Sequence, residues 1–228
     1  MDAAPTPSSA PFAPTPPPPH AAASPAPIGP EPSATGPGGV LRLESHDRRL
    51  VRLAAGFYGI ATLFALGYAA FSGTIGTIFG EEGPGAGAIL AAVAMGLGIV
   101  GLSRLGARVL PRVSRAADAL GDLLGPLSWG GAIVLALMSG VAEELLFRGA
   151  LWPHLGLFGT TFLFGLVHFV PKRALWGYPL FALVAGLLLG LLRRGSGSVL
   201  PPMLAHTIVN AMNLAWIGRR RSVAPPTA

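Results

Sequence analysis

The sequence predicts an all-α protein: a polytopic transmembrane helical bundle of about six spans, preceded by a disordered N-terminus rich in proline and alanine. Three observations support this fold class. Hydrophobic residues make up 51% of the 228 residues and charged residues only 11%, whereas soluble domains carry about 25% charged residues. Mean hydropathy is +0.59. The arginines lie at the ends of long apolar runs, which is where residues that set membrane topology are found.

Residues 1–39 are the first predicted segment, a disordered tail. Proline, alanine and serine dominate its sequence ("APTPPPPHAAASPAPIGPEPSATGPGG"). Such a segment buries too little apolar surface to offset the entropy lost on ordering. It contains no basic stretch followed by an apolar core, so it does not resemble a secretory signal peptide.

Residues 40–124 are predicted to hold N-terminal membrane helices and one interfacial helix. The apolar runs at 53–72 and 85–103 are the first two predicted spans. Residues 104–124 ("RLGARVLPRVSRAADALGDLL") mix arginines and aspartates with leucines at helical spacing. We therefore expect this segment to lie along the membrane surface as an amphipathic helix.

Residues 125–217 are predicted to form a membrane core, and residues 218–228 a basic cytoplasmic tail. Some of the apolar runs in the core are shorter than the ~20 residues that cross a bilayer core of about 30 Å. These runs cover residues 127–152, 156–170, 175–192 and 199–217.

The distribution of basic residues predicts the orientation. With the N-terminus inside, three of the sixteen basic residues (Arg148, Arg193 and Arg194) fall outside, which leaves thirteen on the inner side. Because cytoplasmic loops carry the excess of Lys and Arg, both termini are expected in the cytoplasm, and the protein is expected in the cell inner membrane. The expected partner is the lipid bilayer, with no nucleic acid. The chain has no cysteine, which excludes disulfides and a thiol nucleophile.

A few polar residues lie inside the apolar runs of the predicted core. An ionised side chain in hydrocarbon costs about 2.5–3.5 kcal/mol on insertion scales, so each of them is a candidate functional residue. Glu144 and Arg148 are one helical turn apart and can form an ion pair. Glu143 is turned onto a different face, so the two acids need not have the same role. The set is Glu143, Glu144, Arg148, His168, His206 and Asn210.

Chain distance adds a second constraint on these residues. The midpoint of positions 143 and 168 falls in the predicted turn "WPHLG", so an antiparallel hairpin would bring Glu143 and His168 to one depth. His206 reaches that depth only if the last helix begins with a bend or is partly immersed. Pro201 and Pro202 can allow such a start.

Two interpretations of the set follow from its chemistry. Intramembrane polar residues can join helices, each hydrogen bond contributing about 0.6–2 kcal/mol. Alternatively, a carboxylate can act as a general base on water, with an imidazole sharing that water. A second imidazole and an amide can donate hydrogen bonds to a forming oxyanion. Two histidines and a glutamate can equally ligate zinc, although the sequence has no HExxH motif.

Three short motifs carry a family resemblance. The stretches "EELLFR" (143–148), "FGLVH" (164–168) and "HTIVN" (206–210) resemble the ordered motifs EExxxR, FxxxH and HxxxN. These motifs belong to the CAAX-protease-and-bacteriocin-processing (CPBP) family of intramembrane endopeptidases, which includes the eukaryotic Ras-converting endopeptidase. Each motif alone is weak, but all three in order inside apolar runs are a specific match over residues 125–217.

The resemblance implies a role for each matched residue. Glu143 would activate water with the help of His168, and His206 and Asn210 would form the oxyanion hole. Members of this family are often labelled metalloproteases, and a metal-independent glutamate mechanism is the competing view. We favour the second, with no cofactor required, because Asn210 is a poor zinc ligand and a good oxyanion donor. If zinc is present, its ligands would be Glu143, His168 and His206. Supporting roles would fall to Glu144, Arg148 and Phe164.

The predicted function is therefore that of an intramembrane endopeptidase acting on a membrane-associated protein or peptide. The alternative is a non-catalytic immunity or scaffold protein, or a proton-coupled carrier, because proton relays also use intramembrane Glu and His. A relay needs groups that cross the bilayer, whereas these are expected in one layer. The sequence also lacks the inverted repeat typical of many transporters.

Overall fold

A computed structural model describes residues 1, 43, 45–81 and 83–223 of the chain. The predicted disordered tail at 1–39 lies, apart from Met1, outside the described residues. The described residues from Leu43 onward belong to one unit. In its described part all regular elements are helices and none is a strand, which confirms the predicted all-α fold class.

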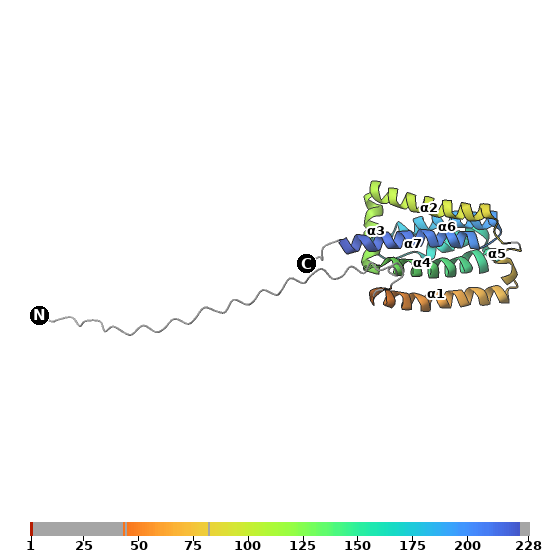
Figure 1. The fold of residues 1–228 in the computed structure, drawn as a ribbon, viewed down its shortest axis with the longest axis horizontal. Helices are drawn as coiled ribbons and strands as arrows, with labels where there is room; N and C mark the ends of the chain where they lie inside the picture. The colour runs from red at the N-terminus through yellow and green to blue at the C-terminus, as the bar shows by residue number, and fades with distance from the viewer. Residues whose placement is uncertain (2–42, 44, 82, 224–228) are drawn as a thin grey trace, which may run out of the picture. The chain divides into compact units, whose positions relative to one another are not determined.

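The predicted apolar runs correspond to six longer helices, and one amphipathic helix joins the second of them to the third (Figure 1). Four helical segments are long and apolar enough to cross a membrane, and α5 is a shorter apolar helix. The four are Ser45–Phe71, Ala86–Val109, Trp129–Ala150 and Arg173–Ser196. The elements are α1 (Ser45–Phe71), η2 (Ile75–Thr77), α2 (Ala86–Val109), α3 (Pro111–Leu124), α4 (Trp129–Glu144), the π-helix η3 (Leu145–Ala150), α5 (Trp152–Val167), η4 (Arg173–Leu175), α6 (Tyr178–Ser196) and α7 (Leu200–Val223).

Helix α7 occupies the middle of the bundle. It lies between α4 and α2, α1 covers the other side of α4, and α5 packs mainly against α6 (Figure 1). The sequence predicted a hairpin of the helices on either side of "WPHLG", whereas the larger contacts of α4 and α5 are with α7 and α6. The predicted turn itself is present, because Gly156 has the non-helical angles φ 61° and ψ −164° and interrupts α5 after its first residues.

The interfacial helix is shorter than predicted. The sequence predicted a helix over 104–124, but α2 continues to Val109 and α3 begins only at Pro111. Proline cannot donate the backbone hydrogen bond that would continue α2, and it disfavours a helical conformation in the residue before it. Leu110 accordingly has φ −116° and ψ 105°. The first two arginines of the predicted interfacial helix therefore belong to α2.

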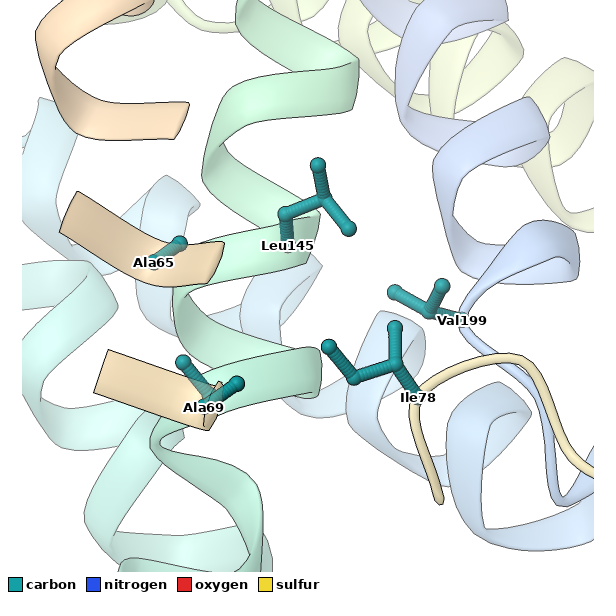
Figure 2. Packing of buried hydrophobic residues seen from close by; sticks show 6 residues of the cluster. Ala65, Ala69, Ile78, Leu145 and Val199 are labelled. Carbon is teal, nitrogen blue, oxygen red and sulfur yellow. The ribbon is translucent and has the colours of Figure 1, made fainter. Parts of the chain in front are cut away.

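The start of α7 is held by a cluster of buried apolar side chains (Figure 2). Ala65 and Ala69 of α1 pack with Ile78, which follows η2, and with Leu145 of η3 and Val199. The Val199 backbone N–H also donates to the Ile78 carbonyl oxygen at 3.0 Å. Helix α7 therefore begins at a fixed point beside η3.

This fixed start explains the depth of His206. Helix α7 begins at Leu200, and Pro201 and Pro202 are buried in its first turn, where a missing backbone N–H costs little. His206 therefore lies only two turns into the helix. It does not require a long straight stretch of helix before it to reach the depth of the other site residues.

Helix α7 continues past the apolar run that ends near residue 217. Residues 218–223 were predicted to belong to a cytoplasmic tail, and α7 extends through them to Val223. Arg220 donates to Asp118 of α3 at 2.6 Å and to Ser114 at 3.1 Å. This contact between segments far apart in sequence extends the helix beyond its apolar part, although an exposed pair of this kind contributes at most about 1 kcal/mol.

Small residues let α4 and α7 approach closely. A Cβ atom at Gly140 of α4 would lie 3.2 Å from the Thr207 backbone nitrogen and 3.3 Å from its Cα. Close approach of this kind is typical of helix pairs in membranes.

We expect Gly140→Val to lower the stability of the folded protein by about 1–3 kcal/mol, because the branched side chain overpacks this contact. The measurement is the thermal unfolding midpoint in detergent. Gly98→Val is the matched control, since a Cβ at Gly98 of α2 meets nothing within 4 Å. Equal midpoints for the two variants would contradict the importance of the α4–α7 contact.

Candidate active site

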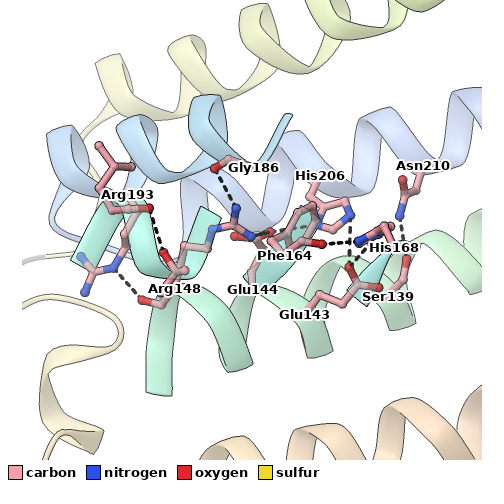
Figure 3. Close-up of polar contacts among 12 residues, drawn as sticks. Ser139, Glu143, Glu144, Arg148, Phe164, His168, Gly186, Arg193, His206 and Asn210 are labelled. Carbon is pink, nitrogen blue, oxygen red and sulfur yellow. Dashed lines mark hydrogen bonds and ion pairs between the residues drawn. The ribbon is translucent and has the colours of Figure 1, made fainter. Parts of the chain in front are cut away.

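The structure brings the residues of the three motifs together from four segments of the chain (Figure 3). Two acids come from the end of α4 and the arginine from η3. Phe164 lies on α5, and His168 directly follows this helix as its C-cap residue. His206 and Asn210 lie one turn apart on α7. Residues more than sixty positions apart thus meet in one cluster, as the Glu144–His206 hydrogen bond shows.

Glu143 faces both histidines. Its Oε2 atom lies 3.8 Å from His168 Nε2 and 3.9 Å from His206 Nε2. The Glu143 side chain is 17% exposed, and its Oε2 atom is buried without a hydrogen-bond partner among the described residues. These separations are too long for direct hydrogen bonds. They are short enough for a water molecule to bridge the Glu143 carboxylate to either imidazole.

The other nitrogen of each imidazole is already engaged. His168 Nδ1 donates to the Phe164 carbonyl oxygen at 2.6 Å, since a carbonyl only accepts. His206 Nδ1 donates to Glu144 Oε1 at 2.8 Å. Fixing one nitrogen of a histidine sets the tautomer and the ring orientation. Both Nε2 atoms are therefore directed at Glu143, each able to accept a proton.

Glu144 belongs to a different, fully buried network, as its separate helix face predicted. Its Oε1 atom also accepts from Arg148 Nη1 at 2.8 Å, and both side chains are 0% exposed. Arg148 Nη2 donates to the Gly186 carbonyl oxygen of α6 at 2.8 Å. The predicted Glu144–Arg148 pair is thus present. Its additional role is to orient His206.

Phe164 packs against three members of the cluster. Its ring centre lies 4.5 Å from that of His168 and 5.7 Å from that of His206. The Arg148 guanidinium carbon is 4.5 Å from the same ring centre, within the range of a cation–π contact. Phe164 therefore holds the two imidazoles and the buried arginine at fixed separations.

Asn210 is held by a residue that sequence reasoning missed. Its Nδ2 atom donates to Ser139 Oγ of α4 at 2.9 Å. Ser139 lies one turn before Glu143 on the same helix, so i,i+4 spacing was a signal that could have identified it. The hydrogen bond uses one of the two Nδ2 hydrogens and leaves the second for another acceptor.

Two tyrosines also lie beside the cluster without having been predicted. The Tyr58 hydroxyl of α1 lies beside Glu143 and Ser139. The Tyr178 ring of α6 meets the His168 ring edge-on at 5.5 Å. These contacts depend on which helices become neighbours, and no local spacing in the sequence indicates them.

Arg193 stabilises the π-helix that follows the two acids. Predicted in an outer loop, it is instead a residue of α6 with only 7% exposure. Its Nε atom donates to the Arg148 carbonyl oxygen at 3.1 Å, and Nη2 donates to the Thr77 carbonyl oxygen at 2.9 Å. These bonds fix the backbone of η3 against η2, and with it the base of the Arg148 side chain.

A small cavity lies against the cluster. Its volume is about 30 Å³, and His168, His206 and Asn210 are among the residues that line it. A cavity of this size with polar walls has room for a water molecule. Within the described part of the chain, no group of three or more His, Cys, Asp or Glu side chains is arranged to hold a metal ion.

Comparisons with known proteins agree with the motifs. Residues 125–212 match the model of the family described as Rce1-like, type II CAAX prenyl endopeptidase. The uncharacterized protein YpbD of Bacillus subtilis (strain 168) is 40% identical over 82 residues, which are 35% of this chain and 42% of that protein. This alignment covers less than half of either protein. No solved structure matches the chain.

All three motifs fall inside the matched segment, and four helical segments in the described part of the chain have the length and composition to cross a membrane. The resemblance to the CAAX-protease-and-bacteriocin-processing family is thus confirmed over residues 125–212, which are similar to the Rce1-like type II CAAX prenyl endopeptidases.

Proposed function

We propose that this protein is an intramembrane endopeptidase that hydrolyses a peptide bond of a membrane-associated protein or peptide. The observation that carries the proposal is the meeting of a carboxylate and two imidazoles within 3.9 Å, in a largely buried site. The family match over residues 125–212 supports a protease-type hydrolase in general. The roles proposed for individual residues rest on the geometry of the site.

Glu143 is the residue that activates the water. A water molecule in contact with Glu143 Oε2 and His168 Nε2 gives a proton to the carboxylate as its oxygen attacks the peptide carbonyl carbon. The protonated Glu143 then returns this proton to the amine that leaves. His168, held by its Nδ1 hydrogen bond, keeps the attacking oxygen in line.

His206 and Asn210 stabilise the oxyanion. The free Nδ2 hydrogen of Asn210 and a proton on His206 Nε2 can both point at the oxygen that becomes negative, which is the largest contribution in many acyl-transfer sites. A protonated His206 gives the cluster two anions, Glu143 and Glu144, against two cations, His206 and Arg148. Charge balance of this kind is what a buried ionic site needs.

The proposal requires no resident metal. Asn210 suits an oxyanion better than zinc, since carboxamides are rare zinc ligands beside His, Cys, Asp and Glu. The zinc alternative would assign Glu143, His168 and His206 to one metal and leave the amide without a direct role. Metal analysis separates the two mechanisms.

The decisive experiment uses detergent-purified wild type and His206→Ala with a fluorogenic peptide library and metal analysis of each sample. We expect cleavage by the wild type only, no stoichiometric metal and no loss of activity on chelation. One zinc per protein that is lost in His206→Ala would place both histidines in a metal shell. If His206→Ala retains full activity, the oxyanion role is wrong.

A non-catalytic scaffold or a proton-coupled carrier is the competing class of function. Glu143 Oε2 lies within 3.9 Å of the Nε2 atoms of both His168 and His206, whereas a relay needs a chain of groups across the bilayer; the polar contacts of the site are drawn in Figure 3. Binding of a partner by wild type and by Glu143→Gln alike, without cleavage by either, would favour the scaffold.

We place the protein in the cell inner membrane with both termini in the cytoplasm. The support is the basic residues, of which thirteen of sixteen then lie on the inner side, as membrane insertion requires. Reporter fusions at each terminus test the orientation. An external signal from either one would overturn it.

A further inference from the structure

A second and much larger cavity lies beside the small one at the candidate active site. Its volume is about 690 Å³, and its walls come from α2, α3, η4, the start of α6 and α7. This volume lies within the range of about 300–1,000 Å³ that is usual for ligand pockets. The cavity thus has room for a ligand much larger than a water molecule.

The two cavities share part of their lining. Tyr178, Phe181 and Asn210 line both of them. Asn210 also carries the amide that the proposed mechanism directs at the oxyanion. If a peptide carbonyl lies within reach of that amide, the residues next to it in the peptide would therefore extend into the larger cavity.

The larger cavity is lined mostly by apolar side chains, and the charged residues in its lining are all positive. Trp176, Leu214 and other apolar side chains make up most of the lining. The charged residues that line it are Arg112 and Arg115 of α3 and Arg173 of η4, and neither Asp nor Glu is among the lining residues. Within the described part of the chain, no ion pair engages any of the three arginines.

We infer that this cavity binds the stretch of substrate next to the cleaved bond and selects peptides in which apolar residues adjoin acidic ones. The inference rests on the proposed endopeptidase function and extends it to a substrate class. Apolar side chains of the peptide gain from burial against the tryptophan and leucine walls. Its carboxylates pair with guanidinium groups, whose planar geometry matches carboxylates well.

A lipid phosphate would also pair with these arginines. The shared lining at Asn210 favours the peptide, because the cleaved carbonyl has to lie next to this residue while the adjoining residues occupy the cavity. A headgroup at the mouth of the cavity has no such requirement.

Binding can be measured without cleavage on full-length Glu143→Gln protein in detergent. The probe is a fluorescein-labelled peptide with a run of leucines beside a run of aspartates, and its twin carries asparagines instead. We expect the acidic peptide to bind about tenfold more tightly or better by fluorescence anisotropy, with the difference shrinking as salt screens the charges.

Charge reversal supplies the matched variants. Arg115→Glu with Arg173→Glu should remove the preference for aspartate and create a preference for a lysine twin, a gain that misfolded protein cannot show. Arg108→Glu is the control, because Arg108 is an exposed residue of α2 outside the cavity lining. It should leave the aspartate preference unchanged.

The outcomes separate the inference from the function on which it rests. Equal binding of the aspartate and asparagine peptides, or an equal effect of Arg108→Glu, would overturn the inference even if the wild type cleaves peptides. An aspartate preference without any cleavage by the wild type would support the pocket and count against the endopeptidase. Loss of acidic-peptide binding in phosphatidylglycerol nanodiscs, but not in phosphatidylcholine nanodiscs, would reassign the cavity to anionic headgroups.

Discussion

Glu143→Gln is expected to abolish measurable peptide hydrolysis, with a fall in kcat of about 10²–10⁴-fold for the loss of a general base. The amide is isosteric with the carboxylate but cannot take a proton from water. The two imidazoles keep their Nδ1 hydrogen bonds to Phe164 and Glu144, so neither ring loses its orientation. The folded structure should therefore survive the change.

The assay compares kcat on a fluorogenic peptide with the thermal unfolding midpoint of the same preparation. Because Glu143 is 17% exposed and its Oε2 atom has no hydrogen-bond partner among the described residues, the midpoint should not fall. Glu81→Gln is the matched control: Glu81 is an exposed loop residue, and its amide should leave both kcat and the midpoint unchanged. Retained hydrolysis by Glu143→Gln would contradict the mechanism.

The sequence was sufficient to predict the motif residues of the site because their contacts follow helix geometry. Glu144 and Arg148 lie one turn apart, and their pair forms at 2.8 Å within a single stretch of helix. The same spacing placed His206 and Asn210 on one stripe of α7. Local rules of this kind need no knowledge of which helices are neighbours.

The contacts that could not be predicted all depend on neighbouring helices. Asn210 binds Ser139 only because small residues let α4 and α7 approach. Arg193 looks like a topology residue from its position after an apolar run, yet it reaches back to the carbonyl groups of Arg148 and Thr77. Tyr58 lies on α1 and belongs to none of the three motifs. Tertiary packing alone brings these side chains to the cluster.

The predicted boundaries of helices were wrong where backbone chemistry or tertiary contacts overrode the hydrophobic periodicity. The pattern of residues 104–124 suggested one amphipathic helix, but Pro111 ends the preceding helix and begins a new one. At the other end of the chain, apolar periodicity stops near residue 217. There the ion pair of Arg220 with Asp118 fastens the last turns of α7 to α3.

The second large effect is expected at the buried Glu144–Arg148 pair. Arg148→Met alone should destabilise the protein by about 3–5 kcal/mol, because it leaves the Glu144 carboxylate buried without its cation. Glu144 accepts from both Arg148 and His206 at 2.8 Å, so the histidine compensates only part of the lost charge. The measurement is the urea or thermal unfolding of the purified protein in detergent.

The double variant Glu144→Leu with Arg148→Met separates stability from activity. Replacing both members of a buried ion pair by apolar residues of similar size is often neutral or stabilising, so the double variant should recover most of the stability that Arg148→Met loses. It should not recover hydrolysis, because His206 Nδ1 then has no carboxylate to donate to and the ring is free to turn away from Glu143. Recovery of both stability and kcat would mean that Glu144 is needed only for folding, and the positioning of His206 would then have to come from Phe164 and the packing of α7 alone.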